Sequence, residues 1–78
     1  MTKLSELEPK TKGKIIKVEG AGGIRRRLLD MGVVSGTVFE IEKKAPLGDP
    51  IDIKILGYHL SLRKHEAETI LVEKTRRY

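Results

Sequence analysis

Three consecutive arginines, Arg25, Arg26 and Arg27, form the most chemically distinctive feature of the sequence. A guanidinium keeps its charge at physiological pH and binds a carboxylate or phosphate through two parallel hydrogen bonds. Arginine is also favoured as an anchor of protein interfaces. The run, together with Asp30, therefore predicts a docking site for a protein partner. The alternative is a solvated helix face on which Arg26 and Asp30 form a weak ion pair.

Arg25 differs from the other two arginines in its expected surroundings. On a helical wheel of residues 24–31, with ~100° per residue, Arg25 falls between Leu28 and Leu29. An unpaired guanidinium inside an apolar surface is costly, so we expect Arg25 to meet a carboxylate or loop carbonyls, near Asp49. The apolar stripe that should face the core consists of Ile24, Leu28 and Met31, with Leu29 at its edge.

A second candidate site is the loop Ala45–Pro50, which reads APLGDP. Pro46 in the second position and Gly48 in the fourth are typical of a type I turn, and the two prolines make the loop stiff. Leu47 has no obvious core to enter. Rigid loops often carry binding residues, although a hairpin that needs only a rigid corner would have the same sequence. The candidate docking residues of this loop are Pro46, Leu47, Gly48, Asp49 and Pro50.

The sequence contains no recognisable catalytic constellation, cofactor site or metal site. The chain has no cysteine, and its two histidines, His59 and His65, belong to no triad motif. Their spacing matches no common pair of metal ligands, which favours solvated surface histidines. The glycines of Gly20–Gly23 precede the expected helix without the lysine and hydroxyl residue of a phosphate-binding loop, so they favour a turn with positive φ. We therefore predict that the protein is not an enzyme.

Five short strands and one short helix are expected to position these residues. Apolar and polar residues alternate in each strand, with Ile16 and Val18 on one face of the first strand. Gly32 should end the helix in a left-handed turn. The residues expected to face inward in the next two strands are Phe39, Ile41, Ile51, Ile53 and Ile55. The expected strands cover residues 14–19, 37–44, 51–56, 58–63 and 70–74, the helix covers 24–31, and single helical turns cover Leu4–Leu7, capped by Ser5, and 64–69.

This pattern predicts a mainly β fold, a small SH3-like closed barrel of five strands with one short helix after the first strand. Closure would also leave no exposed strand edge. The 78 residues suffice for one domain, which we expect at residues 1–74, followed by a frayed basic tail at 75–78.

The composition is that of an intracellular globular protein with a moderate positive charge. The chain carries 16 Lys and Arg against 11 Asp and Glu, a formal net charge of +5. Nucleic acid, an acidic protein or an anionic membrane surface are the partner classes that such a charge suits. No apolar run is long enough for a membrane span, and the first residues lack the apolar core of a signal peptide.

Five blocks of the sequence resemble the ferrous iron transport protein A family. They are GIRRRLLDMG, VVSG, APLGDPI, LSLRKHEAE and ILVE, and their order and spacing extend the resemblance over about residues 4–73. Members of this family are small, cytoplasmic and SH3-like. One turn that the family usually forms from Pro-Gly is Ser35–Gly36 in this chain.

The resemblance implies an accessory or regulatory protein of ferrous iron uptake. Such a protein works beside the membrane ferrous-iron transporter, which carries a cytosolic G-protein domain. We expect Arg25–Arg27 and the Pro46–Pro50 loop to form the docking surface for that domain. Direct membrane insertion and nucleic-acid contact are not expected, whereas a homodimer through a strand edge or Leu47 stays open.

Two alternatives come from other functional classes. Because a related SH3-like domain occurs in metal-dependent repressors, the first is a basic module that binds nucleic acid or regulates such a repressor. The chain has no room for a DNA-reading helix and too few aromatic residues for a stacking platform. The second alternative is direct ferrous binding by His59 and His65.

Overall fold

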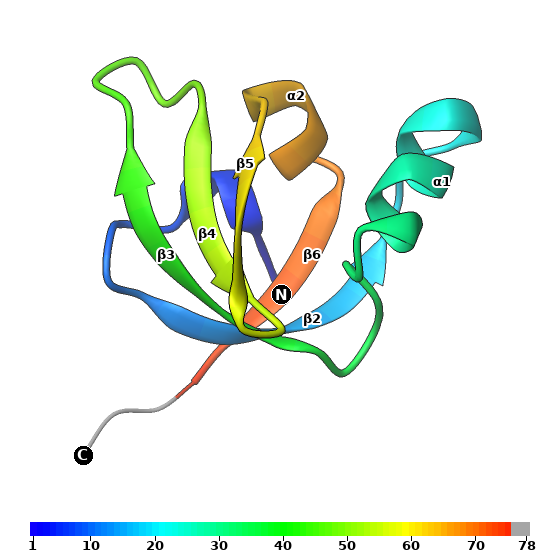
Figure 1. The fold of residues 1–78 in the computed structure, drawn as a ribbon, viewed down its shortest axis with the longest axis horizontal. Helices are drawn as coiled ribbons and strands as arrows, with labels where there is room; N and C mark the ends of the chain where they lie inside the picture. Colours follow the sequence, from blue (N-terminus) through cyan, green and yellow to red (C-terminus); the bar gives the residue numbers. More distant parts are fainter. Residues whose placement is uncertain (76–78) are drawn as a thin grey trace.

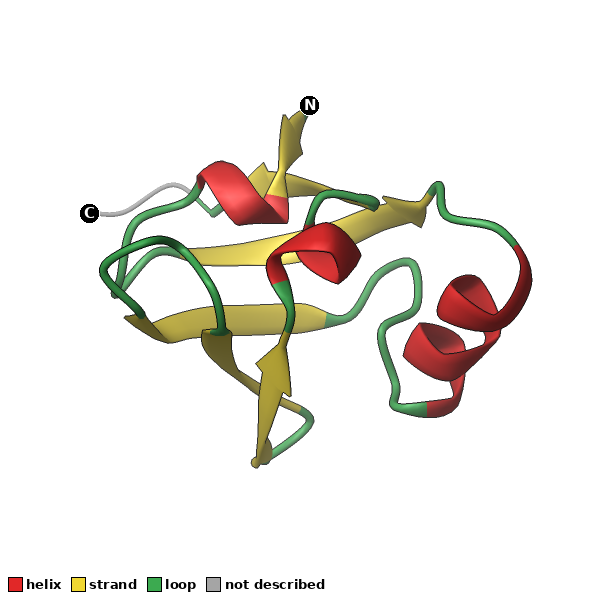
Figure 2. Cartoon of the chain, turned by 90° about the horizontal axis from the view of Figure 1, so that it is seen from above, coloured by secondary structure: helices red, strands yellow, loops and turns green. Residues whose placement is uncertain are grey.

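The computed structural model of the chain describes residues 1–75. Its strands form one antiparallel sheet in the order β1-β6-β2-β3-β4-β5, which curls around an apolar core (Figures 1 and 2). A 3₁₀ turn, Leu4–Glu6, follows β1. The strands are β1 (Thr2–Lys3), β2 (Lys12–Val18), β3 (Val38–Lys44), β4 (Ile51–Ile55), β5 (Tyr58–Leu62) and β6 (Ile70–Lys74), and the helices are α1 (Gly22–Asp30) and α2 (Lys64–Ala67).

The mainly β class is confirmed, and so is the helix after the first predicted strand, which is β2 in the structure. The predicted closed barrel of five strands is wrong. The sheet has six strands, and β1 and β5 stand at its two ends without pairing to each other. The additional strand β1 pairs with β6, where Thr2 lies opposite Val72. A strand of two residues is too short to give a detectable alternation, which is why the sequence did not reveal it.

The alternation of β3 and β4 is confirmed by burial. Phe39, Ile41 and the isoleucines of β4 all belong to the core. Strand β2 departs from its expected pattern, since Ile15 and Val18 are buried while Ile16 is only half-buried. A β-bulge between Ile15 and Lys17 shifts the register, and this shift turns both buried side chains to the same face.

Helix α1 contacts the core through its last turn only. Leu28 is fully buried, and Leu29 and Met31 pack against the core from the helix end. Ile24 is 37% exposed, which corrects its expected place in the apolar stripe. The helix ends as predicted, because Gly32 has a φ of 92°. Its end is held by the β4–β5 hairpin, where the Tyr58 hydroxyl donates to the carbonyl of Met31.

The two predicted single helical turns are present, at Leu4–Glu6 and, where 64–69 was expected, at Lys64–Ala67. The amino-terminal turn places Leu4 and Leu7 in the core, but it begins after Lys3 and not at Ser5. In the 45–50 loop, the Gly48 N–H donates to the Ala45 carbonyl at 2.7 Å, as expected for a four-residue turn.

The carboxyl end of the described chain joins the sheet. The Thr75 N–H donates to the Lys12 carbonyl at 2.9 Å. The rest of the basic tail predicted for 75–78 lies outside the described residues. Within residues 1–75, neither helix has the length and apolar character needed to cross a bilayer.

Candidate functional site

Helix α2 lies between the two segments that the sequence nominates for docking. In Figure 1, α1 stands on one side of α2 and the β3–β4 loop, residues 45–50, stands on the other. The view from above gives the same arrangement (Figure 2). Polar contacts of α2 reach both segments, Arg27 of α1 and Asp49 of the loop.

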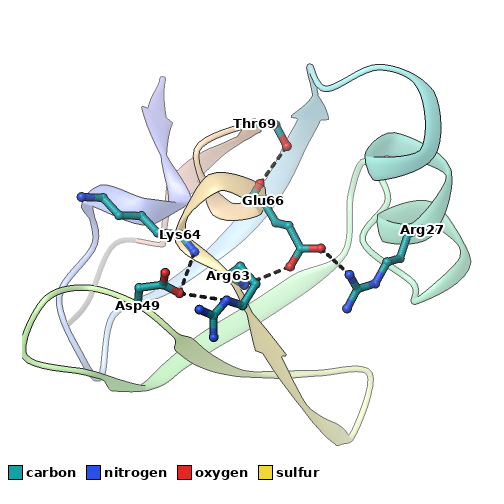
Figure 3. A network of polar contacts seen from close by, with 6 residues as sticks. All are labelled: Arg27, Asp49, Arg63, Lys64, Glu66 and Thr69. Carbon is teal, nitrogen blue, oxygen red and sulfur yellow. Dashed lines mark hydrogen bonds and ion pairs between the residues drawn. The ribbon is translucent and has the colours of Figure 1, made fainter.

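Glu66 is the centre of these contacts (Figure 3). Its side chain is 1% exposed, and its Oε2 lies 2.8 Å from Nη1 of Arg27 on α1. Its Oε1 accepts the Arg63 N–H at 2.9 Å. This second bond follows from the helix start, because a carboxylate in the third helical position reaches back to the free N–H of the residue before the helix. Both oxygens of a buried carboxylate are therefore satisfied.

The same helix start holds the 45–50 loop. Oδ1 of Asp49 accepts the Lys64 N–H at 3.1 Å and lies 3.4 Å from Nε of Arg63. Asp49 is half-buried and Arg63 is exposed, so water screens this ion pair more than the Glu66 pair. A continuous set of polar contacts thus runs from Arg27 through Glu66 and Arg63 to Asp49 (Figure 3).

The contact with a carboxylate or loop carbonyls that was expected of Arg25 is wrong. Arg25 is exposed, and no ion pair or side-chain hydrogen bond involves it within residues 1–75. Arg27 meets the buried carboxylate instead, and Arg63 takes the place expected for Arg25 beside Asp49. The reason is the position of Arg25 along the helix axis. Arg25 lies in the first part of α1, where no residue is buried, and therefore it does not face the core.

The side chains left free for a partner lie at both ends of this arrangement. Arg26 and Asp30 are exposed, and the described residues contain no ion pair between them. Arg27 keeps 60% of its side chain exposed despite its bond to Glu66. At the tip of the 45–50 loop, Leu47 is 88% exposed. The other loop residues are Pro46, which is exposed, and Gly48 and Pro50, which are half-buried.

An open groove adjoins the arginine helix. Its volume is about 520 Å³, and it runs between the end of β2 and α1. Arg25 and Leu29 line its helix side, and Lys17 and Glu19 line its strand side. The groove is therefore charged and mixed in sign.

The two histidines lie on different elements. Nδ1 of His59 on β5 is 2.6 Å from Oε1 of Glu42, and the His59 side chain is exposed. His65 is exposed on α2. In the part of the chain that the structure describes, no group of three or more His, Cys, Asp or Glu is placed to hold a metal ion.

Arg63 and Glu66 are the site residues that sequence reasoning missed. A glutamate three residues after the residue that precedes a helix is half of a known capping pattern, and it was the available signal, although Arg63 stands where that pattern has Ser or Thr. The pattern indicates that the carboxylate points back along the chain. It does not indicate that an arginine from α1 meets it there.

The exposed arginines of α1 and the exposed Leu47 of the 45–50 loop lie on opposite sides of α2 (Figure 1). Exposed arginines and a protruding apolar side chain are features of surfaces that bind other proteins.

Comparison with known proteins gives a consistent result. A model of the FeoA domain family matches residues 2–74 of the chain. An Fe(2+) transport protein A/Fe(2+) transporter FeoB fusion protein of Porphyromonas gingivalis is 42% identical over 71 residues, which are 91% of this chain and 8% of that protein. The chain thus spans a small part of this curated relative.

Two solved structures share the fold over the whole chain. The solution structure of a FeoA-like protein from Clostridium acetobutylicum has a TM-score of 0.87 at 49% identity and covers 100% of this chain and 94% of that one. The zinc complex of Stenotrophomonas maltophilia FeoA has a TM-score of 0.85 at 28% identity, with 100% of both chains covered. That protein is described as a prokaryotic SH3 domain protein and a candidate activating factor of ferrous iron transport.

Proposed function

The chain belongs to the FeoA domain family, and from this premise we propose that it is a cytoplasmic accessory protein of ferrous iron uptake. In this role it docks on the cytosolic G-protein domain of a membrane ferrous-iron transporter and regulates it without being an enzyme. Residues 1–74 are the docking domain.

The observation that carries the proposal is the fusion in Porphyromonas gingivalis. In that protein, which is named as a fusion with the transporter FeoB, one region is 42% identical to this chain. A covalent fusion keeps two domains at a high effective concentration, which favours partners that act together. The same association between separate chains needs a binding surface, and the surface around α2 supplies one.

Charge and shape support docking through α1 and the 45–50 loop. Arg25 and Arg26 project from α1 without an ion pair in the described residues, so a partner with surface carboxylates gains charge-assisted hydrogen bonds there. Leu47 offers an apolar anchor at the other end. A partner that covers both ends must present an acidic patch and an apolar hollow.

The test is a titration of the labelled chain with the nucleotide-loaded cytosolic domain of the transporter. The amide chemical shifts of the labelled chain report binding. Saturable shifts should concentrate in residues 20–36 and 45–50. Arg26→Glu should weaken the affinity by about tenfold, because it replaces an attractive charge by a repulsive one. Lys74→Glu changes the net charge equally at the end of β6, away from α2, and should leave the affinity nearly unchanged. Equal losses for both variants, or no shifts, would overturn the proposal.

A further inference from the structure

We propose that Glu66 is a positioning residue that fixes α1 and the 45–50 loop relative to each other, so that a partner meets both as one rigid surface. The inference rests on the proposed docking function. Its structural part, the coupling of the two segments through α2, concerns the free chain alone.

Glu66 is suited to this role because it is buried and doubly held. Only 1% of its side chain is exposed, and its two oxygens bind groups from different elements, the guanidinium of Arg27 and the N–H of Arg63. A carboxylate in a low-dielectric site that loses one partner is left with an expensive unpaired charge. The carboxylate therefore tends to keep both contacts, and these contacts tie α1 to the start of α2.

The start of α2 in turn sets the position of the 45–50 loop. Asp49 accepts the Lys64 N–H and forms an ion pair with Arg63, the two residues at the beginning of the helix. If α2 shifts or unwinds at its start, both partners move together and Asp49 must follow or lose them. Leu47, two residues from Asp49, moves with this part of the loop.

Helix α2 depends on these contacts because it has four residues. A single helical turn is unstable by itself, since nucleation costs more than one turn of hydrogen bonds returns. The Glu66 carboxylate closes the turn by accepting the Arg63 N–H, and Thr69 closes its other end by donating to the Glu66 carbonyl at 2.8 Å. The turn is thus a rigid link only while Glu66 keeps its bonds.

The first experiment uses the free chain. In Arg27→Gln, which removes the charge that Glu66 faces, amide signals of residues 63–66 and 45–50 should shift. Arg27→Lys should restore much of the wild-type pattern. The matched control is Arg26→Gln, because Arg26 is the exposed neighbour and should leave the signals of 45–50 in place. If Arg27→Gln leaves the 45–50 signals unmoved, the coupling does not exist.

The second experiment measures docking on the transporter's cytosolic domain. Glu66 is too buried to touch a partner, so an affinity loss in Glu66→Gln must arise through the positions of other residues. We expect a loss of about fivefold. Ile53→Val, a small change at a buried site of β4, controls for loss of stability and should keep wild-type affinity.

The outcomes separate the two proposals. If the wild-type chain does not dock, the proposed function fails while the free-chain shifts still decide the coupling. If the wild-type chain docks and Glu66→Gln docks equally well, Glu66 is a structural residue and the inference fails. Should Glu66→Gln not fold, the free-chain shifts of Arg27→Gln against Arg27→Lys decide the coupling without any partner, because the exposed Arg27 tolerates replacement better.

Discussion

Leu56 has a backbone conformation that is unfavourable for its side chain. It forms the β4–β5 turn with Gly57, and the two residues have φ values of 52° and 81°. Two consecutive positive φ values define a turn in which Asn-Gly is strongly preferred. Leu56 is also 64% exposed, although its side chain reaches over the backbone of Gly32 at the end of α1. Little apolar burial offsets the backbone cost.

We expect Leu56→Asn to stabilise the protein. Asparagine tolerates the left-handed region, so the replacement should raise the free energy of unfolding by about 1 kcal/mol. Urea denaturation at constant m-value measures the change. The control is Leu47→Asn, which makes the same replacement at an exposed loop position without positive φ and should change stability by less than about 0.5 kcal/mol. A loss of stability in Leu56→Asn would mean that the contact over Gly32 outweighs the backbone cost.

The three adjacent arginines show what residue spacing can and cannot reveal. A helical wheel gives the angle of a side chain around the axis, and by angle Arg25 faces the side of Leu28 and Leu29. The wheel contains no information about height along the axis. Only the last turn of α1 reaches the core, so Arg25 is exposed, and Arg27, two residues farther along the helix toward the core, meets Glu66.

At the scale of elements, the regular strands were predictable and the irregular ones were not. The isoleucines of β4 alternate with polar residues, and burial on one face of a sheet requires that period. The bulge in β2 and the two-residue β1 leave no such periodic signal, because each depends on the strand that pairs with it. The prediction of a closed barrel was wrong because closure depends on the curvature of the whole sheet, which the pattern of a single strand does not contain.

The candidate site divides in the same way. Its two outer segments were predictable from local chemistry, a charged run and a stiff loop. The link between them was not, because Arg27 and Glu66, like Asp49 and Lys64, are distant in sequence and meet only after the sheet has folded. Pairings of this kind are properties of the tertiary structure.

Glycines in different elements should respond oppositely to the same substitution. A Cβ at Gly13 in β2 would lie 2.7 Å from the carbonyl oxygen of Glu73 and 3.0 Å from the Phe39 ring. A Cβ at Gly23 in α1 would meet nothing within 4 Å. Gly13→Ala should therefore destabilise the protein by about 1–3 kcal/mol through a clash with a neighbouring strand.

Gly23→Ala should stabilise it by about 0.5–1 kcal/mol, because alanine loses less backbone entropy in a helix. Thermal unfolding monitored by circular dichroism gives both values under identical conditions. If Gly13→Ala proved more stable than Gly23→Ala, the backbone of β2 would be able to shift at Gly13 and avoid the clash.

Across the whole molecule, several lysines of the sheet lie opposite glutamates, whereas Arg25 and Arg26 on α1 have no ion pair in the described residues. In the strand register, Lys12 lies opposite Glu40, Glu40 lies opposite Lys54, and Lys14 lies opposite Glu73. Such cross-strand pairs reduce the field at a distance. Helix α1 carries three adjacent arginines against one aspartate, Asp30, and two of these arginines have no ion pair in the described residues. We therefore expect an acidic partner to be attracted to α1.

This asymmetry predicts how docking responds to salt. Between about 50 mM and about 500 mM NaCl, the Debye length falls from about 14 Å to about 4 Å, and steering by Arg25 and Arg26 is screened. The association rate constant should drop by about tenfold while the dissociation rate constant changes little, because rim charges act mainly on the encounter. Stopped-flow mixing of the chain with the transporter's cytosolic domain measures both constants. Arg26→Glu should flatten the salt dependence, and Lys74→Glu should retain it. Affinity that rises with salt would instead assign the docking energy to apolar contact at Leu47 and remove the arginines from the encounter.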